Sequence, residues 1–249
     1  DDAIQLKKKI GEKIDEFIIS EKYEVVFSAS AGVIDVSTVA EGYEECRKKF
    51  EFSLKKAKRM GKNNIYFYRQ EDYEKFQRNG RIISALRSSI ANGCEGFEVY
   101  YQPVYSTEKN DFVTLEALSR LHHPELGWIA PDVFIQIAEK NHMIEQITDL
   151  QFKRICMFIN EHRDLMKKLF NIKVNLSSLD LMRSDCSSHF IRMMDDMDIQ
   201  HDWIQFEITE TVATEYNAGL GMVVDGFMAA GVLSLIHISE PTRPEPISY

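Results

Sequence analysis

Apolar residues recur at helical spacing between charged residues in the first third of the chain. One stripe consists of Ile4, Leu6, Ile10, Ile14 and Ile18. Such spacing predicts amphipathic helices, and short apolar runs between them predict strands. The predicted elements are a helix over 4–19, a strand over 23–30, a helix from about 39 to 60, a strand over 64–68 and a helix over 71–92. Together they predict a small α/β unit over residues 1–70, followed by a linker helix over 71–92.

From Phe97 onward, predicted strands and helices alternate. The strands are predicted over 97–106, 114–121, 172–177 and 203–209, and the helices over 131–141, 144–162 and about 190–197. Alternation of this kind is typical of a β/α sheet or barrel with crossover helices. The Phe and Tyr residues are expected to pack in the hydrophobic core.

Polar residues share one face of three of these strands. With a side-chain period of two, Glu116, Asn175 and Glu207 lie opposite the apolar residues of their strands, and Arg120 lies on the same face as Glu116. In a β/α barrel this face points inward, so these residues would converge. Two carboxylates and an amide oxygen are hard ligands that suit Mg²⁺ or Mn²⁺. The alternative is that each polar side chain is satisfied by local hydrogen bonds.

The charge and composition exclude several classes of protein. A net charge of −9 argues against a nucleic-acid binder, which needs a basic face. The four cysteines are far apart in the sequence, which predicts free thiols in a reducing cytoplasm. No apolar run approaches the roughly 20 residues that span a bilayer. The first residues lack a Met and a signal-peptide pattern, so we expect the natural N-terminus, with any membrane anchor, to lie upstream.

An ordered set of motifs resembles the EAL family of cyclic-di-GMP phosphodiesterases. The motifs are Val99-Tyr-Tyr-Gln-Pro-Val104, Leu115-Glu-Ala-Leu-Ser-Arg120, His123-Pro-Glu-Leu-Gly127, Val174-Asn-Leu-Ser177 and Phe206-Glu-Ile-Thr-Glu210. The resemblance implies a modified TIM-like (β/α) barrel whose first strand is antiparallel. It also implies hydrolysis of cyclic-di-GMP to linear pGpG with Mg²⁺ or Mn²⁺, and a possible homodimer.

The same resemblance assigns roles to individual residues. Glu116, Asn175 and Glu207 match the family's metal ligands. Gln102 and Arg120 match positions that contact the substrate, and Glu210 matches the glutamate that holds a loop over the metals. His122 and His123, which follow the second strand, are expected in a loop rather than at a metal.

Residues 1–70 resemble the C-terminal part of a GGDEF domain. The resemblance rests on Ser30-Ala-Gly-Val33 and Ala57-Lys-Arg-Met-Gly-Lys-Asn63. The GGDEF signature itself does not occur in the sequence, so this chain is not expected to act as a cyclase.

The EAL resemblance covers residues 93–232 and then stops. A helix over 217–230 and Gly231-Val232 fit the family, but Leu233-Ser-Leu-Ile-His-Ile-Ser-Glu-Pro-Thr-Arg243 stands where paired aspartates are expected. That string resembles a translated sequencing-library adapter, so residues 233–249 are interpreted as an artefactual tail. The family's general-base lysine and paired aspartates are then absent. We expect a truncated barrel that is poorly soluble and inactive as written.

Three functions remain open for the parent protein. A phosphodiesterase is favoured, because every family motif before the break is intact. A degenerate EAL domain that binds cyclic-di-GMP as a receptor is the alternative. A scaffold that binds no nucleotide would be expected to have lost Glu116 or Arg120.

Overall fold

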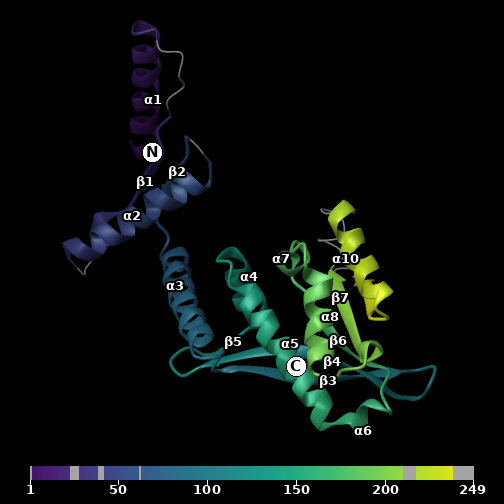
Figure 1. Ribbon diagram of the computed structural model, residues 1–249. Helices are drawn as coiled ribbons and strands as arrows, with labels where there is room; N and C mark the ends of the chain where they lie inside the picture. Colours follow the sequence, from purple (N-terminus) through teal and green to yellow (C-terminus); the bar gives the residue numbers. More distant parts are fainter. Residues whose placement is uncertain (1, 23–27, 39–41, 62, 210–216, 238–249) are drawn as a thin grey trace. The chain divides into compact units, whose positions relative to one another are not determined.

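Figure 1 shows a computed structural model of the chain, which describes residues 2–22, 28–38, 42–61, 63–209 and 217–237. The chain divides into two compact units, Asp1–Gly80 and Arg81–Tyr249. Each unit is described by itself below.

The first unit is a small α/β arrangement. Its elements are α1 (Asp2–Ser20), β1 (Ala31–Val33), the 3-10 helix η1 (Val36–Thr38), α2 (Tyr43–Arg59), β2 (Ile65–Phe67) and the beginning of α3 (Gln70–Ala91). β1 and β2 pair in parallel, and Phe52, Ala57, Tyr66 and Tyr73 form a small core. Gly32 lets α2 approach β1, because a Cβ on Gly32 would lie 2.4 Å from the Leu54 backbone nitrogen. The helix predicted over 4–19 is confirmed as α1, although none of its residues is buried.

The second unit contains one mixed sheet. Its strands are β3 (Phe97–Ser106), β4 (Asp111–His123), β5 (Gly127–Ile129), β6 (Asn171–Asn175), β7 (Ile204–Thr209) and β8 (Leu233–His237). The order is β3-β4-β6-β7-β8, with β5 paired to β4. β3 runs antiparallel to β4, whereas β4, β6, β7 and β8 are mutually parallel. An antiparallel first strand beside parallel strands is consistent with the expected TIM-like barrel, and the described strands form an open sheet.

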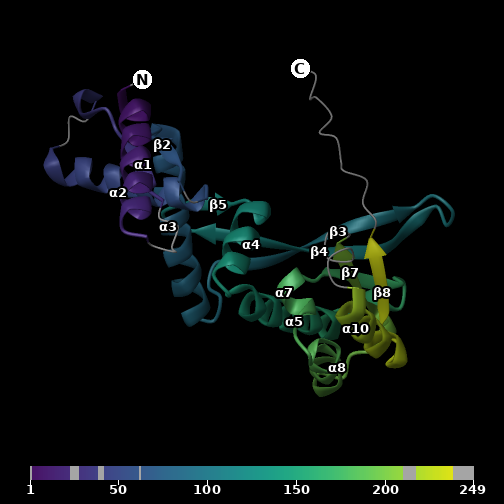
Figure 2. The same ribbon diagram turned by 90° about the horizontal axis from the view of Figure 1, so that it is seen from above.

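Helices cover one face of this sheet. They are α4 (Pro131–Lys140), α5 (Ile144–Glu161), α6 (Arg163–Met166), α7 (Ser178–Leu181), α8 (Cys186–Asp196), η2 (His201–Trp203) and α10 (Asn217–Ala229). Figure 2 shows α5, α8 and α10 together on one side of the strands. Their core centres on Phe206, whose ring centroid lies 5.5 Å from Phe152, 5.3 Å from Phe190 and 4.5 Å from Phe227. Burying these apolar rings holds the helices on the sheet, because each buried aromatic removes a large apolar area from water. The opposite face carries the alternate residues of the strands, among them Glu116, Lys173 and Glu207.

Several local expectations can be compared with these elements. The strand over 97–106 has the bounds of β3, whereas β4 is longer than predicted and includes His122 and His123. Their predicted loop position is wrong, because both residues pair with β5. The strand predicted over 23–30 falls partly on residues 23–27, which lie outside the described residues, and β1 begins at Ala31.

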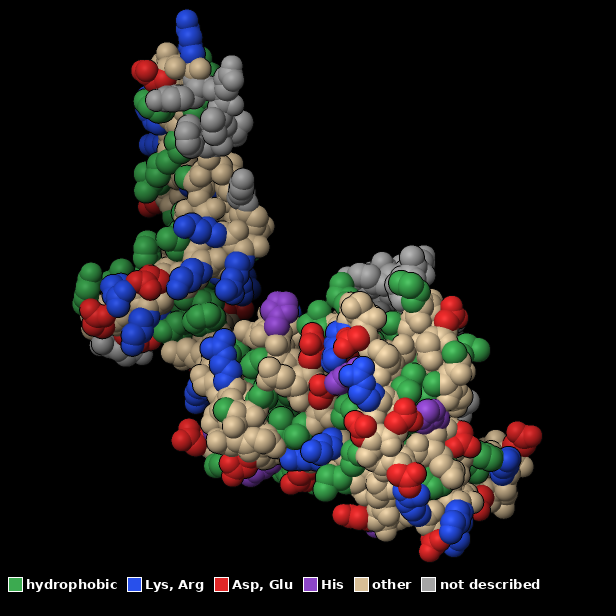
Figure 3. All heavy atoms as spheres, viewed as in Figure 1, with side chains coloured by type: hydrophobic (Ala, Val, Ile, Leu, Met, Phe, Trp, Pro, Cys, Tyr) green, Lys and Arg blue, Asp and Glu red, His purple; other side chains and the backbone are tan. Residues whose placement is uncertain are grey.

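The cysteines are free, as expected, and burial raises the pKa of the Cys156 and Cys186 thiols to about 12. Such thiols stay protonated and act as small apolar side chains. Within the described residues, no helix is both long and apolar enough to cross a bilayer. Figure 3 shows acidic and basic side chains interspersed over the helix-covered face of the second unit.

Candidate functional site

Three neighbouring parallel strands bring the predicted metal ligands onto one face of the sheet. Glu116 of β4 pairs with Lys173 of β6, and Asn175, two residues further along β6, pairs with Glu207 of β7. Paired residues share a face, and residues two apart on a strand share a face. The buried Leu115, Ala117, Val174 and Phe206 occupy the alternate positions and face the helices.

Glu116 and Asn175 are in direct contact. The Asn175 Nδ2 atom donates a hydrogen bond of 3.2 Å to Glu116 Oε1. This bond orients the amide, so that the Asn175 carbonyl oxygen is directed away from Glu116. Two oxygen-bearing side chains are thereby held together at the centre of the open face.

Glu207 forms an ion pair with Lys173 of β6. The Lys173 Nζ atom lies 2.7 Å from Glu207 Oε1, and Glu207 is only 8% exposed. A buried carboxylate needs such a partner, because an unpaired buried charge is costly. Lys173 was missed in the sequence, although it has the same parity as Asn175 on the predicted strand and could have been found by that rule.

The two predicted substrate-contacting residues lie on the same face. Gln102 of β3 is paired directly with Glu116. The Arg120 side chain lies over the Tyr100 ring, 5.6 Å from its centroid, and donates to the Ser119 carbonyl oxygen at 2.9 Å. Arg120 forms no ion pair with any described carboxylate, so its guanidinium can contact an anionic ligand. Glu210 lies outside the described residues.

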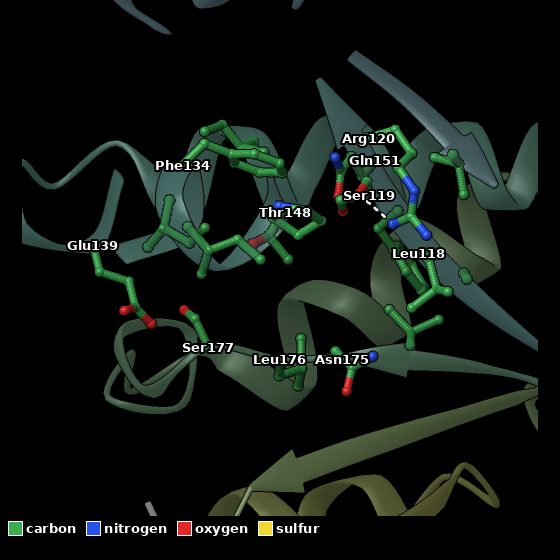
Figure 4. Close-up of a pocket in the computed structure, with 18 of the residues that line it drawn as sticks. Leu118, Ser119, Arg120, Phe134, Glu139, Thr148, Gln151, Asn175, Leu176 and Ser177 are labelled. Atoms are coloured by element: carbon green, nitrogen blue, oxygen red, sulfur yellow. Dashed lines mark hydrogen bonds between the residues drawn. The ribbon is translucent and has the colours of Figure 1, made fainter. Parts of the chain in front are cut away.

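A pocket of about 700 Å³ opens at the carboxyl ends of β4 and β6. Helices α4 and α5 form its other walls. Figure 4 shows Arg120 and Ser119 on one side of the pocket and Asn175 and Ser177 on another, with Gln151 of α5 hydrogen-bonded to Ser119. The pocket therefore connects Arg120 and Asn175 with polar groups from the helix layer.

A capping box fixes the turn that follows Asn175. Ser177 caps α7, and its hydroxyl and backbone N–H both donate to Asp180 Oδ2, at 2.7 and 3.0 Å. Thr148 of α5 donates to the same oxygen at 3.0 Å. The Ser177-x-x-Asp180 spacing is a known helix-start signal and could have predicted this turn. It ties the end of β6, and thus Asn175, to α5.

Glu139 lies at the pocket wall near Asp180. Burial, and after it the charge of Asp180, raises the pKa of the Glu139 carboxyl above its ordinary value. Asp180 is fully buried, and its Oδ1 atom has no hydrogen-bond partner among the described residues. Asp180 has no part in the sequence prediction, and Glu139 enters it only within the family motif Ala138-Glu139, with no role assigned.

The donor set suits a hard divalent cation. Glu116 and Glu207 supply carboxylate oxygens and Asn175 an amide oxygen, which are ligands that Mg²⁺ and Mn²⁺ accept. Among the described residues, no group of three His, Cys, Asp or Glu side chains gathers as a metal cluster. The site would depend on the asparagine and on displacing Lys173 from Glu207.

Comparisons with known proteins agree with this arrangement. The EAL domain matches residues 83–236. The chain is 26% identical over 212 residues to the cyclic di-GMP phosphodiesterase NbdA of Pseudomonas aeruginosa, covering 85% of this chain and 27% of NbdA. It is 24% identical over 231 residues to the bifunctional diguanylate cyclase/cyclic di-GMP phosphodiesterase MucR of the same species, covering 93% of this chain and 33% of MucR. The chain thus spans about a third or less of these relatives.

Solved structures show the same fold. A PaMucR phosphodiesterase in complex with c-di-GMP superposes with a TM-score of 0.56 at 23% identity, covering 62% of each chain. The FimX EAL domain from Pseudomonas aeruginosa, bound to c-di-GMP, gives a TM-score of 0.53 at 19% identity, covering 61% of this chain and 60% of that chain. Because the family match includes most of the chain, with the strands that carry Glu116, Asn175 and Glu207, this chain belongs to the EAL domain family.

Proposed function

We propose that this chain is a fragment of a GGDEF-EAL signalling protein. The EAL domain of the complete protein hydrolyses cyclic-di-GMP to linear pGpG with two divalent metal ions, and the fragment itself does not turn the substrate over. The observation that carries the proposal is the placement of Glu116, Asn175 and Glu207 on one face of three adjacent strands. Gln102 and Arg120 on the same face are suited to hold the phosphodiester, Arg120 by a charge-assisted hydrogen bond. The two relatives NbdA and MucR both carry cyclic di-GMP phosphodiesterase in their names.

The activity is proposed to need Mg²⁺ or Mn²⁺, held by Glu116, Asn175 and Glu207. When bound, such an ion activates water and stabilises the charge that develops on the phosphate. The protein's part is to orient the ligands: Asn175 through its hydrogen bond to Glu116, and the turn after it through the capping box of α7. No described residue is assigned as the general base.

Metal-dependent binding of the dinucleotide tests the proposal on this chain. We expect cyclic-di-GMP to bind in the presence of Mn²⁺, and Glu116→Gln to abolish that dependence, as measured by isothermal titration calorimetry. Glu145→Gln changes an exposed carboxylate of α5 and should have no effect. If the affinity for cyclic-di-GMP is the same with and without Mn²⁺, and the same in Glu116→Gln as in the unmodified chain, the proposed site is refuted.

A receptor that binds without cleaving is the second candidate. The observation in its favour is Lys173, which already supplies a cation to Glu207. Chromatography of the reaction mixture distinguishes the two functions. Metal-dependent formation of pGpG by the protein that the complete gene encodes supports the phosphodiesterase. Tight binding of cyclic-di-GMP without formation of pGpG supports the receptor.

The remaining proposals concern the rest of the chain. Residues 1–70 are proposed to be the end of a GGDEF-like domain, and cytoplasmic location and homodimerisation remain predictions. Residues 233–243 are proposed to be encoded by adapter sequence. Of these, 233–237 form β8, paired with β7, and 238–243 lie outside the described residues. The nucleotide sequence of the gene tests this proposal, since codons that depart from the adapter would refute it.

A further inference from the structure

An exposed group of aromatic side chains lies at the carboxyl end of β4. It consists of Tyr100 of β3, His122 of β4 and Trp128 of β5, and is called the aromatic platform here. The centroid of the Trp128 ring lies 6.2 Å from that of Tyr100 and 5.0 Å from that of His122, and both pairs meet edge to face. Trp128 is 55% exposed and Tyr100 is 46% exposed, so the rings cover one another only in part.

The strand register places the aromatic platform on the same face as the candidate site. Tyr100 is paired with Leu118, and Trp128 with His122, while Gln102 is paired with Glu116. Leu118 and His122 lie two and six residues beyond Glu116, so all of them share its face. Tyr100 and Gln102, two residues apart on β3, are separated by roughly 7 Å along the strand.

Arg120 joins the two parts of this face. Its guanidinium lies over the Tyr100 ring and is the group proposed to bind phosphate. A cation over an aromatic ring beside exposed rings is the combination with which proteins hold a base and its phosphate together. Neither Tyr100 nor Trp128 belongs to a hydrophobic cluster of the described residues, so their rings are available for contact with a ligand.

We propose that the aromatic platform is the stacking surface for one guanine base of cyclic-di-GMP, with Trp128 as its principal ring. This inference rests on the proposed function, because it takes the ligand from it. Stacking on Trp128 would place the base beyond Arg120 and leave its phosphate between Arg120 and Glu116. Because a purine has a larger π surface than a pyrimidine, the protein should bind a cyclic dinucleotide with purine bases more tightly than one with pyrimidine bases.

The chain offers a matched control on the same hairpin. Tyr105 and Phe112 also form an exposed edge-to-face pair between β3 and β4, with centroids 5.3 Å apart and exposures of 47% and 54%. This pair lies at the opposite end of the hairpin, toward residues 106–111. If exposed aromatic pairs only stabilise the hairpin, both pairs will respond alike to substitution.

Tryptophan fluorescence reports on the proposed contact directly. The chain has two tryptophans, and the other, Trp203, is 9% exposed in the helix layer. We expect cyclic-di-GMP with Mn²⁺ to quench the Trp128 emission and to protect it from acrylamide. The quenching should disappear in Trp128→Phe, which keeps a stacking ring and should bind within about threefold of the unmodified chain.

Affinity measurements by calorimetry complete the test. When a base stacks on an aromatic ring, replacing the aromatic residue with alanine weakens the affinity about tenfold. We expect that loss for Trp128→Ala, a smaller loss for Tyr100→Ala and no change for Phe112→Ala. Equal affinity of Trp128→Ala and the unmodified chain, or an equal loss of affinity for Phe112→Ala, would overturn the proposed stacking on the aromatic platform.

The outcomes distinguish this inference from the proposed function. If cyclic-di-GMP binds with Mn²⁺ while Trp128 emission is unchanged, only this inference fails. If cyclic-di-GMP does not bind at all, the proposed function fails as well.

Discussion

At the scale of single residues, Lys173 is the feature with the largest consequence for the site. Its ammonium is paired with Glu207 at 2.7 Å, with side-chain exposures of 22% and 11%. A divalent ion that uses Glu207 must compete with this internal cation. The pair stabilises the metal-free protein and would weaken binding of the proposed metal ion.

Replacement of this lysine separates the two effects. Lys173→Met leaves Glu207 buried without a partner, which should cost about 3 kcal/mol of unfolding free energy without metal. Millimolar Mn²⁺ should restore much of that loss, so the metal-induced rise in Tm is expected to exceed that of the unmodified chain. Lys167→Met is the control, because Lys167 and Asp164 form a solvent-exposed ion pair, with 69% and 93% side-chain exposure, whose loss should change stability little. A smaller metal response in Lys173→Met would show that Lys173 does not compete for the site.

At the scale of elements, His201 connects η2 to the ends of α8 and α10. Its Nδ1 atom lies 2.7 Å from the Ala230 carbonyl oxygen, and its Nε2 atom lies 2.8 Å from Asp195 Oδ1. Both ring nitrogens face acceptors, so both bonds form together only when the ring is protonated. The bond to Ala230, and after it the bond to Asp195, outweighs burial and raises the pKa of His201 above 6.5.

A pH dependence of stability follows from this arrangement. Because the folded-state pKa is raised, the stabilisation is fully present below pH 6.5 and is lost as the pH rises through the folded-state value. In urea unfolding, His201→Gln should therefore be less stable than the unmodified chain at pH 5.5, with a smaller difference at pH 8.5. Asp195→Asn should reduce the same pH dependence in part. A difference that is identical at both pH values would contradict protonation of His201.

The elements also show how far sequence patterns reach. The apolar alternation of residues 97–106 and the stripe of residues 144–162 predict β3 and α5 closely, because each extends over several periods. β5 and α7 have only three and four residues, too few for a period to be visible. The sequence predicts that residues 233–237 are foreign to the family, yet as β8 they pair with β7 along five residues. Backbone pairing in a parallel sheet needs extended residues at the edge and does not depend on a family motif.

The same limit applies to the site. Parity was sufficient to place Glu116, Asn175 and Glu207 on one face, because that rule is local to each strand. It could not show that Asn175 contacts Glu116, since that requires the register between β4 and β6. The sequence predicts Tyr100 in the core with the other Phe and Tyr residues, but Tyr100 is 46% exposed. Strand periodicity does not show what covers a given face of the sheet.

At the scale of the whole molecule, the two units have separate hydrophobic cores. Phe52, Ala57, Tyr66 and Tyr73 form the core of the first, and two larger clusters centred on Phe206 and Phe134 belong to the second. All proposed ligand-binding residues lie in the second unit, Arg81–Tyr249. A ligand that binds a folded unit stabilises that unit by mass action and does not stabilise one that it does not contact.

This separation predicts a selective response to ligand. Trp128 and Trp203 both lie in Arg81–Tyr249, so tryptophan fluorescence reports on that unit, whereas far-UV circular dichroism also reports on α1 and α2. With Mn²⁺ and cyclic-di-GMP at 100 times Kd, the fluorescence-detected unfolding free energy should rise by about 2.7 kcal/mol. Part of the far-UV unfolding transition should keep the midpoint that it has without ligand, because the ligand is proposed to bind only residues of the second unit. A single transition that shifts equally by both probes would show that the two cores unfold as one cooperative unit.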